Sequence, residues 1–314
     1  MEYDVIGDIH GHAGHLVALL RKLGYRERGG AWRHPDPGRT AIFVGDFIDR
    51  GPGQLDAIGI VRGMLDAGTA QAVMGNHEFN AVAWHTPHPH EPDRHLRKRS
   101  GKNRDQHAAF LGETEHDPAL HQEMVDWFLT LPLWLDLPGL RVVHACWSPA
   151  HVASLQPLLL PGNRLDLALV AAASCPGTME YDAIETLLKG PELELPPGHS
   201  FLDPGGVERT KVRLRWWDAT ASTYRQAGIA NGVKSHDLPE LPIPPGSLAG
   251  YGGQAGDKPV LFGHYWESGT PRVQSPTAAC VDYSACKGGP LVAYHWQGEA
   301  ELRDAHFIRS DAPT

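Results

Sequence analysis

The sequence predicts an α/β fold in which helices alternate with the strands of a parallel sheet. Short apolar runs typical of buried strands alternate with segments whose apolar residues recur at helical spacing. Many of the apolar runs also end in glycine and polar residues. The chain has 314 residues, of which 41% are hydrophobic and 21% charged, an ordinary globular composition. We expect one domain over residues 1–314, with insertions at about 85–120 and 150–258.

The N-terminal part shows the clearest alternation. Residues 3–6, 41–44 and 72–74 are apolar runs of strand length. Two helices between them are predicted to end at Gly24 and Gly68. Their apolar residues at helical spacing are Leu16, Leu19, Leu20 and Leu23 in the first, and Leu55, Ile58, Val61 and Leu65 in the second. This β-α-β-α-β order predicts a parallel sheet that is covered on both faces.

The rest of the chain is less regular. The segment at 85–107, HTPHPHEPDRHLRKRSGKNRDQH, is either a solvated surface loop or a device that steers anions to a site. Residues 150–258 are rich in proline and glycine, and we interpret them as a cap. Further helices are predicted near 124–131, 164–173 and 179–189, and further strands at 140–143, 260–262, 279–281 and 291–296.

Composition excludes several classes of protein. The net charge of −9 gives no overall attraction to nucleic acids or anionic membranes, so we expect neither as a stable partner. The four cysteines are too few and too scattered for a disulfide framework. Because no apolar run is long enough to span a membrane and no basic-then-apolar leader is present, a cytoplasmic location is expected.

Polar side chains with metal-binding ability follow nearly every predicted core strand. They occur in the motifs GDIHGH, GDFIDRG, GNHE, VVHAC and LFGH and are Asp8, His10, Asp46, Asp49, Asn76, His77, His144 and His264. Because the carboxyl ends of parallel strands meet at one edge of a sheet, these side chains should converge. Oxygen and imidazole donors without a thiolate suit Mn, Fe or Zn better than a structural zinc site.

These motifs resemble those of the calcineurin-like metallophosphoesterases, in particular the phosphoprotein phosphatase branch, which is marked by GDxHG, GDxVDRG, GNHE and two later histidines. The resemblance covers residues 4–78, about 125–147 and 259–297. It implies a β-sandwich built from βαβαβ units, with flanking helices and an inserted cap. It also implies two divalent metal ions, with Mn²⁺ expected and Fe or Zn as alternatives.

The resemblance also implies a role for each motif residue. One metal would be held by Asp8, His10 and Asp46. The other would be held by Asp46, Asn76, His144 and His264. His77 would be the general acid, oriented by Asp49, and Arg50 would bind the phosphate. A second phosphate-binding arginine has no clear counterpart, and its candidates are Arg213, Arg215 and Arg225.

The implied activity is hydrolysis of phosphomonoesters, with phosphoserine or phosphothreonine as candidate substrates, by in-line attack of a hydroxide that bridges the metals. The substrate would be a phosphorylated protein or nucleotide. The stretch CVDYSACKGGPLVAY resembles the end of bacterial diadenosine tetraphosphatases, so symmetric hydrolysis of dinucleoside tetraphosphates is an alternative. Trp216 and Trp217 either stack an adenine or, more commonly, pack the cap onto the core. A non-catalytic metal-binding regulatory domain is disfavoured, because every ligand position is filled.

Overall fold

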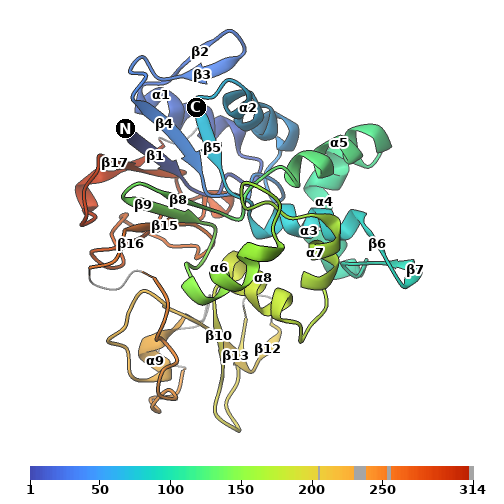
Figure 1. Ribbon diagram of the computed structural model, residues 1–314, viewed down its shortest axis with the longest axis vertical. Coiled ribbons are helices and arrows are strands. Elements are labelled where there is room, and N and C mark those ends of the chain that lie inside the picture. The colour runs from blue at the N-terminus through green and yellow to red at the C-terminus, as the bar shows by residue number, and fades with distance from the viewer. Residues whose placement is uncertain (204–205, 230–237, 253–255, 311–314) are drawn as a thin grey trace.

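A computed structural model describes residues 1–203, 206–229, 238–252 and 256–310 and shows two β-sheets packed face to face (Figure 1). The larger sheet has five strands in the order β18-β17-β1-β4-β5. Its strands are β1 (Glu2–Ile6), β4 (Arg39–Phe43), β5 (Ala70–Ala72), β17 (Val292–Trp296) and β18 (Phe307–Arg309). β1, β4 and β5 are parallel, as predicted, whereas β17 is antiparallel to both β1 and β18.

The second sheet has four strands in the order β16-β15-β9-β8. They are β8 (Trp134–Leu137), β9 (Leu140–Val143), β15 (Val260–Phe262) and β16 (Ala278–Cys280). β15 is parallel to both of its neighbours, and β8 forms an antiparallel hairpin with β9. The predicted strands at 140–143, 260–262, 279–281 and 291–296 are therefore confirmed to within a residue or two.

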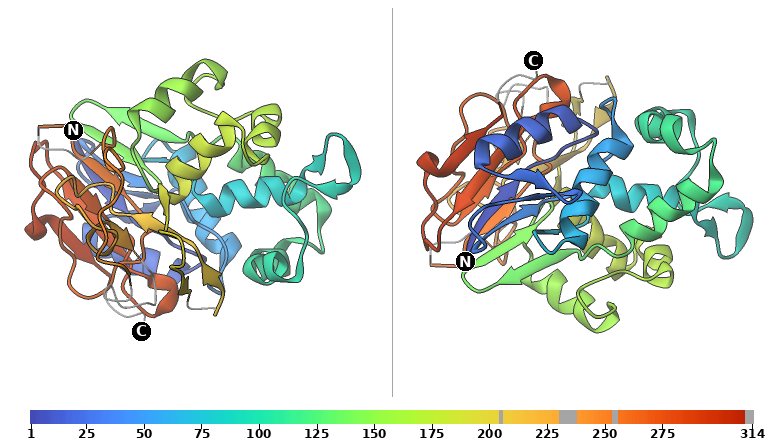
Figure 2. Two further views of the ribbon diagram at one scale, coloured as in Figure 1. Left: turned by 90° about the horizontal axis from the view of Figure 1, so that it is seen from below. Right: turned by 90° about the horizontal axis from the view of Figure 1, so that it is seen from above.

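Side chains alternate between two cores along the central strands. Val5 and Ile42 face the second sheet, in a cluster with Leu140 and Leu261. Ile6, Ala41 and Phe43, which are next to them along the strands, belong to the other core, which includes the buried leucines of the first helix. This period of two is what a strand buried on both faces produces. The predicted cover on both faces is confirmed, because helices lie on one side and the second sheet on the other (Figure 2).

The two N-terminal helices end close to their predicted ends. They are α1 (Ala13–Leu23) and α2 (Gln54–Asp66). Gly24 follows α1 with φ of 99°, a left-handed conformation that favours glycine, and its N–H bonds the last turn. The small hairpin β2 (Arg26–Arg28) and β3 (Ala31–Arg33) joins α1 to β4. None of the helices in the described residues combines the length and apolarity needed to cross a bilayer.

The prediction of a loop throughout 85–107 is wrong, because the segment contains a short hairpin and the start of a helix. A short hairpin of β6 (Pro87–His88) and β7 (Glu91–His95) projects from the molecule (Figure 2). The helix α4 (Gly101–Thr114) then begins, with the Ser100 side chain accepting a hydrogen bond from Asn103 N. Its polar sequence hides the helical period, because a histidine and a threonine are among its buried residues. The neighbouring helices are α3 (Asn76–His85) and α5 (Pro118–Phe128).

The cap packs against β15 through its two tryptophans. Trp216 and Trp217 are almost fully buried, with ring centroids 4.8 and 5.1 Å from that of Phe262. The packing interpretation therefore holds, since neither ring is accessible to a base. The cap's elements are α6 (Pro149–Leu155), η1 (Gln156–Leu158), α7 (Leu167–Ala173), α8 (Met179–Lys189), β10 (Glu192–Glu194), β11 (Phe201–Leu202), β12 (Glu208–Arg209), β13 (Lys211–Leu214), α9 (Tyr224–Ala227) and β14 (Gly228–Ile229). Two 3₁₀ turns, η3 (Ala285–Lys287) and η4 (Asp304–His306), flank β17.

A fully buried carboxylate on β1 depends on one arginine. Asp4 accepts hydrogen bonds of 2.7 Å from both Nε and Nη2 of Arg39, and further bonds from Tyr25 and His295. Burial raises the pKa of Asp4, but the hydrogen bonds from His295 and Arg39 outweigh it and lower the pKa overall. Asp4 is therefore a charged group whose burial is tolerated only with its cation in place.

We expect Arg39→Met to lower the free energy of unfolding by about 3–5 kcal/mol, because it leaves a buried charge without its cation. The half-exposed pair of Arg62 and Glu123 provides the control, since Arg62→Met should cost no more than about 1 kcal/mol. Urea titrations at neutral pH measure both. The contribution of Asp4 is lost as the pH falls through its depressed folded pKa, so the deficit of Arg39→Met should shrink in acid. Equal losses in the two variants would contradict this account.

Candidate two-metal active site

The predicted site residues meet at one edge of the sandwich. Asp8 and His10 follow β1, Asp46 and Asp49 follow β4, and the others follow β5, β9 and β15. All of them are less than one tenth exposed, and they are Asp8, His10, Asp46, Asp49, Asn76, His77, His144 and His264. The expectation that the strand ends converge is therefore correct in geometry.

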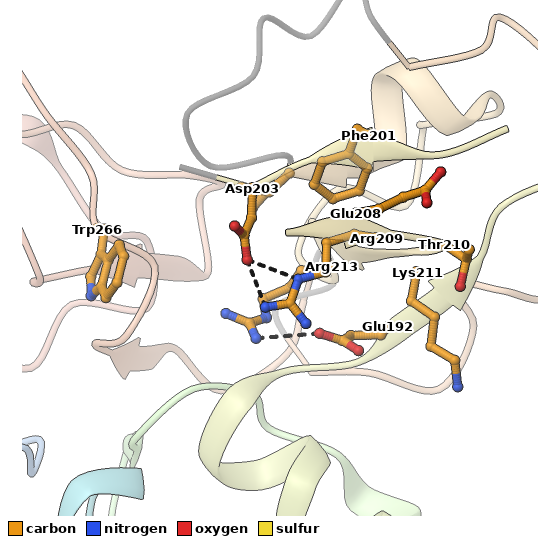
Figure 3. Close-up of a pocket in the computed structure, with 10 residues that line it drawn as sticks. Glu192, Phe201, Asp203, Glu208, Arg209, Thr210, Lys211, Arg213 and Trp266 are labelled. Atoms are coloured by element: carbon orange, nitrogen blue, oxygen red, sulfur yellow. Dashed lines mark hydrogen bonds and ion pairs between the residues drawn. The ribbon is translucent and has the colours of Figure 1, made fainter. Parts of the chain in front are cut away.

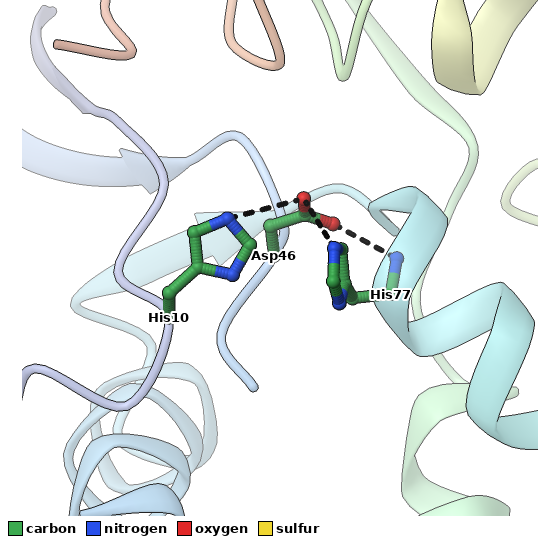
Figure 4. Close-up of side chains that lie close together, drawn as sticks. All are labelled: His10, Asp46 and His77. Atoms are coloured by element: carbon green, nitrogen blue, oxygen red, sulfur yellow. Dashed lines mark hydrogen bonds and ion pairs between the residues drawn. The ribbon is translucent and has the colours of Figure 1, made fainter. Parts of the chain in front are cut away.

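Asp46 lies between two groups of side chains that could each hold a metal ion. In the first, the donor atoms of His10, Asp46 and His77 lie within 4.8 Å of one another. Figure 4 shows the two imidazoles on opposite sides of the Asp46 carboxylate, with Nε2 atoms 3.6 and 3.9 Å from Oδ2. The second group is Asp46, His144 and His264, also within 4.8 Å. Asp46 belongs to both groups.

Backbone carbonyls orient two of the histidines. His10 Nδ1 is 2.9 Å from Ile48 O, and His144 Nδ1 is 2.7 Å from Val44 O. A carbonyl can only accept, so Nδ1 carries a proton in both rings and Nε2 is the atom that would coordinate a metal. Burial, followed by the neighbouring His77, lowers the pKa of His10 to about 4, which also keeps this ring neutral. Both rings are thus set up as metal ligands.

Buried atoms without partners support a bound cation. Within the described residues, Asp8 Oδ1 and His10 Nε2 are buried and make no hydrogen bond. Leaving such a group unpaired costs about 1–3 kcal/mol, and more for a charged one. Burial raises the pKa of Asp8 strongly, and the charges of Asp282 and Asp46 raise it further. A divalent ion would satisfy these atoms, and the all-N, all-O donor set fits one.

Strained backbone brings these side chains together. His10, Asp46, Asp49, Arg50 and His264 have φ between 46° and 75°, the left-handed region that non-glycine residues seldom adopt. Each such residue costs on the order of 1 kcal/mol or more and persists only where the surroundings enforce it.

Two glycines make the close approach possible. A Cβ on Gly75 would lie 2.2 Å from Asp46 Oδ1, and one on Gly263 would lie 2.1 Å from Asp8 Oδ1. Any larger residue at Gly75 of GNHE or Gly263 of LFGH would therefore clash with a site carboxylate.

One aspartate links two histidines beside the metal ligands. Asp49 Oδ2 accepts from His77 Nδ1 at 2.5 Å, and Asp49 Oδ1 accepts from His107 Nδ1 at 2.8 Å. Burial raises the pKa of Asp49, but the bonds from His107 and His77 outweigh it and hold the pKa well below its usual range. His107 is not among the site residues predicted from the sequence, because it lies at the end of the histidine-rich segment that was expected to be a loop.

A cavity of about 770 Å³ opens beside these side chains. Asp46, His77, Arg50 and Arg213 line it, among others. Arg213 Nη1 lies 2.8 Å from His264 Nε2. In Figure 3 it lies in an adjoining pocket, across from Trp266.

The structure separates the three arginine candidates. Arg213 reaches the site, whereas Arg225 bonds Leu238 O and Glu240 within the cap. Arg215 lines neither of the two cavities beside the site.

An α/β sandwich with two clusters that could hold metal ions and that share one carboxylate is typical of metal-dependent hydrolases. Residues 1–164 match the family model of the calcineurin-like phosphoesterases. The chain belongs to this family.

The chain is also similar to several named relatives and solved structures. Bis(5'-nucleosyl)-tetraphosphatase PrpE [asymmetrical] of Halalkalibacterium halodurans is 48% identical over 77 residues, and that of Bacillus subtilis 43%. Each match covers 24% of this chain and 31% of the relative, so it spans about a third of the relatives' length. A protein serine/threonine phosphatase from Saccharomyces cerevisiae matches 99% of this chain and 79% of its own, with a TM-score of 0.55 and 14% identity, which shows the fold. A putative diadenosine tetraphosphatase matches 99% of this chain and 94% of its own, with a TM-score of 0.45 and 15% identity.

Metal content should distinguish the shared carboxylate from the other ligands. If Asp46 serves both ions, Asp46→Asn should retain neither after loading with Mn²⁺ and desalting, whereas Asn76→Ala should lose no more than one. Elemental analysis of the folded proteins measures this directly. Asp56→Asn, which changes an exposed carboxylate on α2, is the matched control. Equal and partial losses in the first two variants would contradict a shared ligand.

Proposed function

We propose that this protein is a metal-dependent phosphatase that hydrolyses phosphomonoesters, with phosphoserine and phosphothreonine as candidate substrates. The observation that carries the proposal is the pair of metal-competent clusters that share Asp46 and open, beside His77, into an arginine-lined cavity. Phosphoryl transfer needs charge neutralisation and a proton donor close together, and this arrangement offers both.

The residues that would hold two divalent ions form two sets, and Asp46 belongs to both. Asp8 and His10 would complete one ion's site, and Asn76, His144 and His264 the other's. Mn²⁺ remains the expected metal. When bound, such ions supply Lewis-acid stabilisation of phosphoryl oxygens and lower the pKa of water.

His77 is positioned to donate a proton to the leaving group. Its Nδ1 is engaged by Asp49, so only Nε2 faces the cluster and the cavity. His107 binds the other oxygen of the same carboxylate and thereby fixes the plane of Asp49. A carboxylate held at both oxygens cannot rotate away, which keeps the His77 ring in one orientation.

Two arginines border the place where the phosphate would lie. Arg50 and Arg213 both line the cavity, and Arg213 Nη1 lies beside His264. An arginine offers a planar fork that matches phosphate oxygens. We assign Arg50 to the first phosphate contact and Arg213 to the second, which the sequence did not separate from Arg215 and Arg225.

Hydrolysis of dinucleoside tetraphosphates is the second candidate. It is favoured by the relatives' names and by a cavity larger than a single phosphate requires. The sequence-based alternative was symmetric cleavage, whereas those names specify the asymmetrical reaction. Products therefore have to be identified as well as counted.

A panel of substrates on the Mn²⁺-loaded protein tests the proposal. Phosphopeptides, nucleotides, nitrophenyl phosphate and diadenosine tetraphosphate are compared by kcat/KM, with Asp46→Asn as the control for contaminating phosphatases. We expect phosphomonoesters to be hydrolysed. Efficient cleavage of diadenosine tetraphosphate with monoesters ignored would favour the second candidate, and no turnover of any phosphate ester would refute the proposal.

The leaving group should reveal the role of His77. General acid catalysis contributes about 10²–10⁴-fold, and an alkoxide needs the proton far more than a nitrophenolate does. His77→Ala should therefore reduce kcat on an alkyl phosphate by about 10²-fold or more beyond its effect on nitrophenyl phosphate, and His107→Gln should do the same more mildly. Asp8→Ala should impair both esters alike. If His77→Ala loses metal, or slows both esters equally, His77 is a ligand and not the donor.

A further inference from the structure

The basic side chains of the segment 94–104 fall into two groups. Arg94 forms an ion pair with Glu91 on the projecting hairpin, and Arg104 pairs with Glu115. Arg99 bonds the carbonyl of Trp84 and lies over its ring. Two others, Arg97 and Lys102, line the same cavity as the metal-competent clusters.

Arg97 is held by neutral groups. Its guanidinium donates to Asn80 Oδ1 at 2.6 Å, Gln106 Oε1 at 3.0 Å and Asn103 Oδ1 at 3.4 Å. The Asn103 amide is itself fixed, because its Nδ2 donates to Lys98 O at 2.7 Å. Within the described part of the chain, no carboxylate hydrogen-bonds the Arg97 side chain. Three amides thus fix the direction of the guanidinium without neutralising it.

Burial makes this arrangement costly for the protein alone. Desolvation lowers the pKa of Arg97, and the charges of Asp49 and Glu185 only partly oppose it. A cation taken out of water without a close anion costs free energy that only an opposite charge restores. Arg94 and Arg104 have ion pairs instead, and Arg99 does not line the cavity. Arg97 is therefore the arginine of this segment that borders the cavity without a carboxylate partner.

The position of Arg97 relates it to the reaction site. Asn80 lies on α3, which also carries His77, and Gln106 lies on α4, which carries His107. The two helices that hold the His77–Asp49–His107 chain therefore also hold Arg97. Arg50 and Arg213 border the metal ligands, so Arg97 is additional to the contacts that one phosphate would use.

We propose that Arg97, with Lys102, forms a second phosphate subsite that binds a phosphate linked to the one being hydrolysed, so that the cavity selects linear polyphosphate chains. This inference rests on the proposed phosphatase function but goes beyond it, because a simple monoester would leave the subsite unused. A nucleoside polyphosphate or an inorganic chain has the required chemistry. A peptide with separate phosphates does not.

Competition experiments test the subsite. Phosphate and tripolyphosphate are compared as inhibitors of nitrophenyl phosphate hydrolysis in initial rates, with free metal held constant and in excess. The same anions are titrated calorimetrically into the metal-loaded protein. We expect tripolyphosphate to bind at least about tenfold more tightly than phosphate. Arg97→Gln should reduce that ratio about tenfold, as loss of charge-assisted hydrogen bonds does. Arg94→Gln, in the same segment but paired with Glu91, should leave the ratio unchanged.

Several results would overturn the inference. The first is that the wild-type protein shows no preference for tripolyphosphate over phosphate. The second is that the ratio of the two affinities is unchanged in Arg97→Gln, or falls equally in Arg94→Gln. The third is that binding of a doubly phosphorylated peptide, and not of tripolyphosphate, depends on Arg97. If Arg97→Gln unfolds at a lower temperature than the wild type, Lys102→Gln is tested instead, and its ratio of tripolyphosphate to phosphate affinity is measured. If nitrophenyl phosphate is not hydrolysed at all, the proposed function fails. The calorimetric ratio then still decides on the subsite.

Discussion

The geometry of the site depends on how one carboxylate, Glu78, holds two loops together. Its Oε2 accepts hydrogen bonds from Asp46 N at 2.8 Å and Gly75 N at 3.0 Å, and its Oε1 accepts from Phe47 N at 2.8 Å. These bonds join the loop after β4 to the start of α3. They hold Asp46 in its left-handed conformation, and the Asp46 carboxylate in turn accepts from His77 N at 2.9 Å. Without these hydrogen bonds, the backbone of Asp46 would be expected to relax from its strained conformation.

Much of this arrangement could be predicted from the sequence, because strand ends and glycines leave local signals. The βαβαβ order placed Asp8, Asp46 and Asn76 at one edge, and the glycines indicated close backbone approach. The strands of the second sheet were also predicted from their apolar runs, but only the family resemblance implied that the strands form a sandwich.

The residues that the sequence did not reveal are those whose positions depend on tertiary packing. His107 and Arg97 come to the site only because α4 forms from a polar, histidine-rich segment. Arg213 differs from Arg215 and Arg225 by its place on β13, next to His264, and no local pattern encodes that neighbour. Inserted segments are positioned by long-range contacts, so their chemistry has to be read from the structure.

The proposed metal ligands and the proposed phosphate-binding groups come from different parts of the fold. The proposed metal ligands come from strand ends of the sandwich, and His264 N donates to Asp8 Oδ2, which joins the loop after β15 to the loop after β1. The groups that we propose to bind phosphate, apart from Arg50, come instead from the insertions. The Trp216 indole donates to Ala145 O, so the strand that carries Arg213 is fixed against the loop that carries His144. A change in an insertion can therefore alter which phosphate compound is bound while leaving the metal ligands in place.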